Sequence, residues 1–214
     1  MLADKVAEIL LNIKAVRLSV EAPFTWASGW KSPIYCDNRK VLSFPAQRRA
    51  LAEGFAAEVR SRYPEAEAVA GVATGAIAWG ALAAELLELP FVYVRSEAKG
   101  HGLRNLIEGH IAPGTRCVVI EDLISTGKSS VQAVRALQEA EVQVLGTVAI
   151  FNYGFPEAEQ AFGAAGVPFH SLTGLKVLLD KAVAFHYLRP DELETVLQWQ
   201  QAPAVWKGPD SATF

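Results

Sequence analysis

The sequence predicts an α/β domain with a mostly parallel central sheet flanked by helices. Short apolar runs rich in β-branched residues, at 68–73, 91–94, 117–120 and 144–151, have the continuous hydrophobic character of buried parallel strands. Segments with helical spacing of apolar residues alternate with these runs, as they do in chains of β-α units. The length of 214 residues, with 51% hydrophobic and 20% charged residues, is typical of one globular domain.

The first half of the chain begins with an amphipathic pattern. Apolar residues recur at helical spacing over 3–16, which predicts a helix used for packing or for a subunit contact. A short strand is expected at 34–36, between turns marked by glycine and proline. A helix over 46–62 follows, and an alanine-rich helix over 76–87 packs after the first buried strand.

The second half repeats the alternation less regularly. Residues 152–156 follow a buried strand and are therefore expected near the ligand-binding edge of the sheet. Glycines and a proline within 163–168 predict a break in the chain. Helices are expected at 175–183 and 190–200, and 203–214 is expected to be a loose tail.

Composition narrows the class of protein. The net charge of −3 lacks the basic footprint of a nucleic-acid-binding protein, and no apolar run is long enough to span a bilayer. Charged Asp4, Lys5 and Glu8 make the N-terminus unlike a signal peptide, so we expect a soluble cytoplasmic protein. Cys36 and Cys117 lack metal-ligand spacing, and Cys117 is expected to be a buried free thiol.

The strongest functional signal follows the strand at 117–120. Glu121 and Asp122 come directly after it, and the turn Ser125-Thr126-Gly127 then leads into a helix. The start of a helix attracts phosphate, because its backbone N–H groups and dipole favour negative charge. Two acids beside a phosphate site are unexpected, because negative charges repel. They are explained if the ligand also offers hydroxyls or a bound divalent cation. A sugar phosphate offers both.

Two other interpretations of this stretch are open. Gly127-Lys128-Ser129 matches the end of a P-loop, but the first glycine of that motif would fall at residue 122, which is Asp. The P-loop is therefore disfavoured. An ordinary strand–turn–helix with solvated acids is the other alternative, since turns rich in Ser, Thr and Gly are common.

The stretch resembles the phosphoribosyl pyrophosphate (PRPP) motif of type I phosphoribosyltransferases. The resemblance implies that Glu121 and Asp122 lie by the ribose hydroxyls and that the following loop wraps the 5′-phosphate. That loop comprises Leu123, Ile124, Ser125, Thr126, Gly127, Lys128 and Ser129. The turn Thr74-Gly75 resembles the pyrophosphate loop of the same family; some relatives have Tyr-Lys there, so the resemblance implies only backbone contacts for this chain. A plain strand–helix turn is the alternative there.

A second resemblance concerns an N-terminal segment at about 20–40. The run Phe24-Thr25, Ser28-Gly29 and Lys31-Ser32-Pro33-Ile34-Tyr35 is similar to the hood of orotate phosphoribosyltransferases, which covers the orotate site. It implies orotate contacts from Lys31, Ile34, Tyr35 and Ser125. Relatives often have Lys where this chain has Ala27. A surface hairpin with incidental aromatic residues is the alternative.

A third resemblance lies in a predicted mobile loop at about 95–109. Its pattern, Arg95, Lys99, His101-Gly102 and Glu108-Gly109, resembles the loop that reaches into the partner subunit's site in that family and contacts pyrophosphate. Many relatives have a second Lys where this chain has Ser96, and Leu103-Arg104-Asn105 replaces an acidic, glycine-rich continuation. A solvated charged hairpin is the alternative.

Together the three resemblances imply one phosphoribosyltransferase domain over 1–214 that converts orotate and PRPP into orotidine 5′-monophosphate and pyrophosphate, in the pathway to UMP. They imply Lys99, Asp122 and His101 as catalytic residues, PRPP-bound Mg²⁺ with no direct protein ligand, and a homodimer with shared sites. No Arg occurs at 152–156, where some relatives bind orotate. A purine transferase and a PRPP-sensing regulator without activity are the alternative functions.

Overall fold

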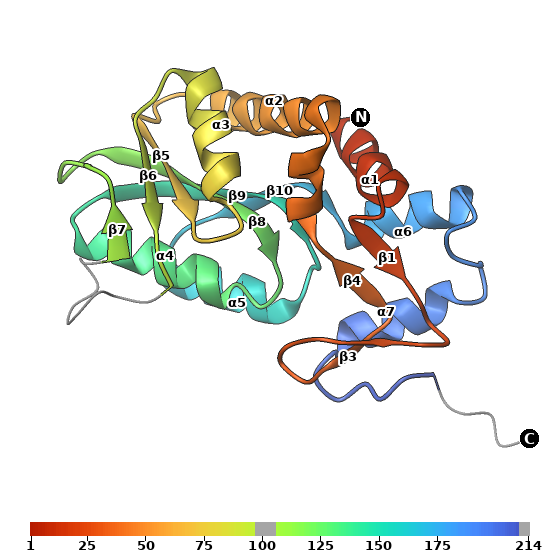
Figure 1. Cartoon of the computed structure of the whole chain (residues 1–214). Helices are drawn as coiled ribbons and strands as arrows, with labels where there is room; N and C mark the ends of the chain where they lie inside the picture. The colour runs from red at the N-terminus through yellow and green to blue at the C-terminus, as the bar shows by residue number, and fades with distance from the viewer. Residues whose placement is uncertain (97–105, 210–214) are drawn as a thin grey trace, which may run out of the picture.

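The computed structural model describes residues 1–96 and 106–209 and has a six-stranded sheet at its centre (Figure 1). Neighbouring strands are parallel, except that the edge strand β7 runs antiparallel to β6. This arrangement confirms the mostly parallel sheet. The spatial order is β10 (Phe169–Gly174), β9 (Gln143–Asn152), β8 (Arg116–Ile124), β5 (Ala68–Val72), β6 (Phe91–Val94) and β7 (Ile107–Glu108).

Helices cover both faces of the sheet. In Figure 1, α2 (Pro45–Arg62) and α3 (Ile77–Leu87) lie above it, and α4 (Lys128–Glu139) and α5 (Pro156–Ala165) lie below it. At the β10 end, α1 (Leu2–Asn12) packs against β10 and against α6 (Leu175–Ala184). The central strand β5 is buried at every residue, as expected for a strand covered on both faces.

The N-terminal hood is built from two short antiparallel strand pairs. Strand β1 (Val16–Leu18) pairs with β4 (Ile34–Cys36), and β2 (Phe24–Thr25) pairs with β3 (Lys31–Ser32). The 3₁₀ helix η1 (Asn38–Ser43) then leads into α2. The C-terminal helix α7 (Leu193–Gln201) lies beside β3, at the lower right of Figure 1.

Several element boundaries differ from the sequence-based prediction. The first helix ends at Asn12 instead of residue 16, and the last begins at Leu193 instead of Pro190. Helix α5 was not predicted. Its Pro156 stands in the first turn, and Gly166 ends it with a left-handed φ of 67°. The glycines at 163–166 therefore mark the end of a helix.

Strand β8 is also longer than predicted. It continues from Arg116 through both acids to Ile124, so Glu121 and Asp122 belong to the strand. A two-residue strand, β7, occupies the end of the predicted loop and pairs Glu108 with Tyr93. The sheet therefore supports both the acids and one side of that loop.

Tyr63 at the end of α2 packs across strand β9 where that strand has Gly146. A Cβ atom at position 146 would clash with the phenol oxygen and ring of Tyr63. The Tyr63 hydroxyl is buried and has no hydrogen-bond partner in the described part of the chain. Burial raises the pKa of this phenol above its ordinary value. Gly146 therefore makes room for a helix end on the sheet.

We predict that Gly146→Ala lowers the free energy of unfolding by about 1–3 kcal/mol, because the added methyl overpacks this contact. Urea denaturation of the purified variant measures the change. Gly163→Ala in α5 is the matched control, since a Cβ there meets no atom within 4 Å.

The control should raise the free energy of unfolding by up to about 1 kcal/mol, because Ala is the better helix former. Equal unfolding free energies for Gly146→Ala and the unsubstituted protein would contradict the prediction.

Candidate active site

Glu121 lies at the end of β8 and is buried, with 4% of its surface exposed. Its Oε2 accepts a hydrogen bond from the Ser130 hydroxyl on α4 at 2.8 Å, and its Oε1 accepts one from the backbone N–H of Asp122 at 2.9 Å. Burial, and then the charge of Asp122, raise the pKa of Glu121 well above its ordinary value. The structure thus holds this acid between β8 and α4, and its contact with ribose stays a prediction.

Asp122 is less buried than Glu121 and faces the turn between β5 and α3. A Cβ atom at Gly75 would clash with the Asp122 carboxylate, so glycine permits the close approach of this turn. The Asp122 carbonyl accepts a hydrogen bond from Asn38 Nδ2 at 2.7 Å. Burial raises the pKa of Asp122 above its ordinary value, against the opposing effects of its bond with Glu121 and the charge of Arg39. The predicted Thr74-Gly75 turn and Asp122 therefore meet.

The loop after Asp122 lines a cavity of about 300 Å³ at the start of α4. We call it the phosphate cradle; its lining residues are Leu123, Ser125, Thr126, Gly127, Lys128, Ser129 and Gln132. Gly127 has a left-handed φ of 77°, and a Cβ there would meet Phe162 of α5 at 3.3 Å. The unpredicted helix α5 thus supports the cradle from behind. Ile124 differs from the other predicted loop residues because its side chain is fully buried.

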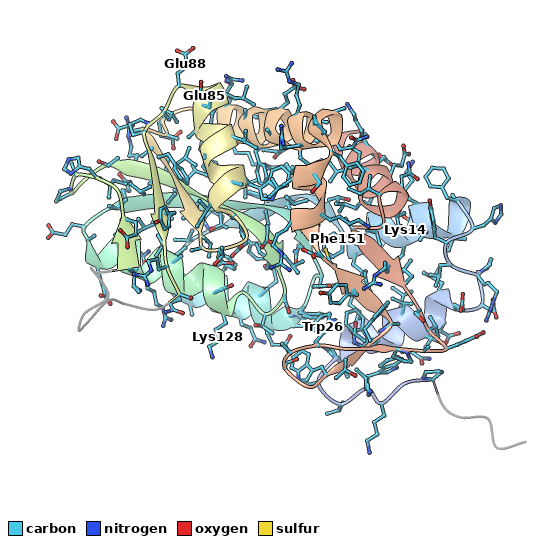
Figure 2. All side chains as sticks on the ribbon, in the orientation of Figure 1. Lys14, Trp26, Glu85, Glu88, Lys128 and Phe151 are labelled. Atoms are coloured by element: carbon cyan, nitrogen blue, oxygen red, sulfur yellow. The ribbon has the colours of Figure 1, made fainter. Side chains whose placement is uncertain are left out.

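A second cavity of about 380 Å³ adjoins the cradle. We call it the base cavity; its lining residues are Thr25, Trp26, Ala27, Tyr35, Cys36, Leu123, Ser125 and Tyr153. Leu123 and Ser125 line both cavities, so the two lie side by side at the end of β8. The rings of Trp26 and Tyr153 lie 5.1 Å apart between centroids. The hood, on which Figure 2 labels Trp26, and the end of the sheet thus form a cavity with aromatic walls beside the cradle, and binding of a flat ring there stays a prediction.

The four residues predicted to contact orotate occupy different positions in the structure. Tyr35 and Ser125 line the base cavity. Lys31 is exposed at its rim, where its Nζ donates to the Thr25 hydroxyl at 2.8 Å. Ile34 is fully buried, and its carbonyl accepts a hydrogen bond from Trp26 Nε1 at 3.1 Å. Ile34 therefore positions Trp26, which the sequence analysis did not single out.

The aromatic residue Tyr153 was expected near the ligand edge without an assigned role. It is buried, stacks on Phe155 at 5.3 Å and faces Trp26 of the hood. The abundance of aromatic residues in the hood was a signal for a ring-binding site. Nothing in the local sequence links Trp26 to a residue more than a hundred positions later.

The described ends of the predicted mobile loop are anchored to the sheet and to α4. Arg95 Nη1 lies 3.4 Å from Glu108 Oε1, and the Ser96 carbonyl accepts a hydrogen bond from Gln132 Nε2 at 3.0 Å. Gln132 also lines the phosphate cradle, so the loop begins beside it. Lys99 and His101 lie outside the described residues, and their catalytic roles stay predictions.

Comparison with known proteins agrees with this geometry. Residues 45–165 match the phosphoribosyl transferase domain. An orotate phosphoribosyltransferase of Cytophaga hutchinsonii is 50% identical over 203 residues, which cover 95% of this chain and 97% of that protein. One from Bacteroides fragilis is 52% identical over 201 residues, which cover 94% and 95%. The chain belongs to the orotate phosphoribosyltransferase family.

A solved structure of this family agrees with the fold described above. Orotate phosphoribosyltransferase from Aeropyrum pernix superimposes with a TM-score of 0.73 at 30% identity, covering 82% of this chain and 97% of that one. The fold described above is therefore one that solved orotate phosphoribosyltransferases share.

We predict that Glu121→Gln flattens the pH dependence of stability. Because the pKa of Glu121 is raised in the folded protein, its contribution to stability is fully present below its unfolded value of about 4.3 and is lost as pH rises through the raised folded value. Gln keeps an acceptor for the Asp122 N–H and a donor for Ser130, without the charge. Urea unfolding at a series of pH values from about 4 to about 8 measures the slope.

Glu157→Gln in the first turn of α5 is the control, since Glu157 is exposed. The control should retain the slope of the unsubstituted protein. If Glu121→Gln lost stability with rising pH as steeply as the unsubstituted protein, Glu121 would not be the source of the pH dependence.

Proposed function

We propose that this protein transfers the phosphoribosyl group of PRPP to orotate, giving orotidine 5′-monophosphate and pyrophosphate in the pathway to UMP. The adjacency of the base cavity and the phosphate cradle carries the proposal, because Leu123 and Ser125 line both. A nucleobase and a ribose 5′-phosphate bound in these cavities meet beside Asp122. The names of relatives about half identical over nearly the whole chain support the same reaction.

The reaction forms a bond between the ring nitrogen of orotate and C1 of ribose, and breaks the bond from C1 to the pyrophosphate oxygen. Orotate brings an anionic nitrogen, so the protein has to position the reactants and place charge around them. The start of α4 holds the 5′-phosphate, and Asp122 faces the ribose hydroxyls. Glu121, bonded to the Asp122 N–H and to Ser130, fixes the end of the strand.

The departing pyrophosphate requires positive charge. Arg95 stands at the end of β6 beside the cradle, and Lys99 and His101 follow it in the chain. In our proposal these three residues neutralise the pyrophosphate as it leaves. The backbone of Thr74-Gly75, held against Asp122, contacts the same group.

Mg²⁺ belongs to this proposal as a companion of PRPP. The oxygens of PRPP and water would hold the ion without a direct protein ligand, because Mg²⁺ usually keeps waters and substrate oxygens in its coordination shell. The described residues contain no cluster of three or more His, Cys, Asp or Glu that could hold a metal by themselves. When bound, the ion would offset the charge of the pyrophosphate.

Association into a homodimer with shared active sites is the last part of the proposal. It rests on the resemblance of the Arg95–Gly109 pattern to loops that act in the partner subunit's site.

Within the described residues, no helix is both long and apolar enough to cross a membrane.

We predict that the purified protein consumes orotate only when PRPP and Mg²⁺ are both present. The absorbance change of orotate on conversion to its nucleotide follows the reaction. Uracil, hypoxanthine and adenine, tested under the same conditions, should react far more slowly, because the hood resembles that of orotate enzymes.

Faster turnover of a purine would favour the alternative purine transferase. PRPP binding without turnover of any of the four bases would favour the PRPP-sensing regulator.

We predict that two inactive variants complement each other in a hybrid dimer. Lys99→Ala and Asp122→Asn remove residues that, in a shared site, come from different subunits. Random mixing after refolding makes about half of the dimers hybrid, each with one intact site, and so restores about a quarter of full activity. Differently tagged chains confirm that hybrids form. If hybrids form and the mixture stays inactive, the loop acts within its own subunit.

A further inference from the structure

Helix α7 is bonded through two adjacent residues to the two walls of the base cavity. Trp199 Nε1 donates to the Lys31 carbonyl on the hood strand β3 at 3.1 Å. Gln200 Nε2 donates to the Tyr153 carbonyl, on the chain after β9, at 2.7 Å. One helix turn near the C-terminus therefore spans the hood and the sheet side of the site.

Trp199 makes the hydrophobic part of this connection. It is fully buried, and its ring packs edge-on against Trp26 at 5.6 Å, Tyr153 at 5.7 Å and Phe155 at 5.4 Å between centroids. Replacing such a core residue costs several kcal/mol and disturbs the whole cluster. Trp199 is therefore a poor probe of any specific effect on the site.

Gln200 makes the polar part of this connection through one hydrogen bond to a backbone carbonyl, that of Tyr153. The Tyr153 N–H donates to the Ile124 carbonyl at 3.1 Å, so the backbone of Tyr153 is bonded to the end of β8 on one side and to Gln200 on the other. The next residue, Gly154, has a left-handed φ of 72°, and a Cβ there would lie 3.0 Å from Gln200 Nε2. The chain thus turns with a glycine where the amide of Gln200 approaches.

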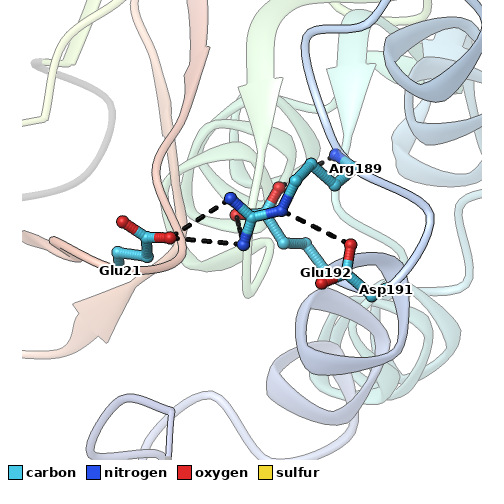
Figure 3. A network of polar contacts seen from close by, with 4 residues as sticks. All are labelled: Glu21, Arg189, Asp191 and Glu192. Carbon is cyan, nitrogen blue, oxygen red and sulfur yellow. Dashed lines mark hydrogen bonds and ion pairs between the residues drawn. The ribbon is translucent and has the colours of Figure 1, made fainter.

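The other polar contacts between the C-terminal segment and the hood are weaker. Figure 3 shows Arg189 reaching Glu21 at 3.2 Å, together with Asp191 and Glu192. The Arg189 side chain is 59% exposed and that of Glu21 is 77% exposed. Exposed pairs of this kind contribute little to stability, because water and salt screen them. Of the polar contacts described above, the bond from Gln200 is the one that reaches Tyr153 from the C-terminal segment.

We propose that Gln200 is a positioning residue for the nucleobase. Its bond to the Tyr153 carbonyl fixes the backbone of Tyr153 between β8 and α7, and so holds the ring of Tyr153 beside Trp26 in the wall of the base cavity. Identifying that base as orotate rests on the proposed function. Without the amide donor, the Tyr153 carbonyl loses its partner and the ring shifts, while the phosphate cradle keeps its own contacts.

Gln200→Met tests this role, because Met has a similar length and volume but no donor. We expect the KM for orotate to rise by up to about tenfold, which is the change if the full free energy of one lost hydrogen bond appears in orotate binding. The KM for PRPP should change less than about twofold, because the cradle is untouched.

Gln198→Met is the matched control, since Gln198 lies on the same helix, is exposed and donates to Glu194 at 3.4 Å. It should leave both KM values unchanged.

Equal KM values for orotate in the two variants would overturn the proposal, as would equal rises in both KM values of Gln200→Met. A crystal structure of Gln200→Met gives a second, independent answer, since an unmoved Tyr153 would also overturn it. If the unsubstituted protein failed to use orotate, the proposed function would be wrong, and the crystal structure alone would decide the role of Gln200.

Discussion

The close approach of Gly75 to the carboxylate of Asp122 is the constraint on which the site depends. Any side chain at position 75 would push the β5–α3 turn away from the end of β8. Asn38, at the exit of the hood, bonds the carbonyl of the same Asp122. Three distant segments therefore meet at one residue. Keeping Asp122 and Glu121 buried together costs free energy, as the raised pKa values of both show. The two ionised acids therefore do not add to the stability of the fold.

The central sheet was predictable because its signals are local. The apolar run of β5 and the helix pattern after Gly127 each depend on a few neighbouring residues. Helix α5 was missed because its weak apolar periodicity lies between glycines and prolines that suggested only turns. The extension of β8 over Glu121 and Asp122 was missed because charged residues rarely continue a buried strand. In the structure Ser130 supplies the hydrogen bond that allows it.

The base cavity was only partly predictable, because its walls come from segments far apart in the sequence. The strands of the hood have two or three residues each, too few to be stable without other support. That support is the packing of Trp26 against Tyr153 and Trp199, together with the hydrogen bond from Trp199 to Lys31. The family pattern in the hood indicated which base to expect. The ring that faces Trp26 and the helix that holds both became evident only in three dimensions.

The acids and the cations of the site lie on different parts of the fold. None of the described residues lining the base cavity is cationic, although orotate carries a carboxylate. Cations surround the two cavities on separate segments: the Arg17 guanidinium lies 5.2 Å from the ring of Tyr35, Lys31 bonds Thr25 on the hood, and Lys128 lines the cradle at the start of α4. Arg39, whose charge acts on Asp122, is exposed and forms its ion pair with Asp37. Cations on peripheral segments can instead meet the substrate's own negative charges. In the proposed reaction, the sheet orients the ribose, and cations on the peripheral segments neutralise the departing pyrophosphate.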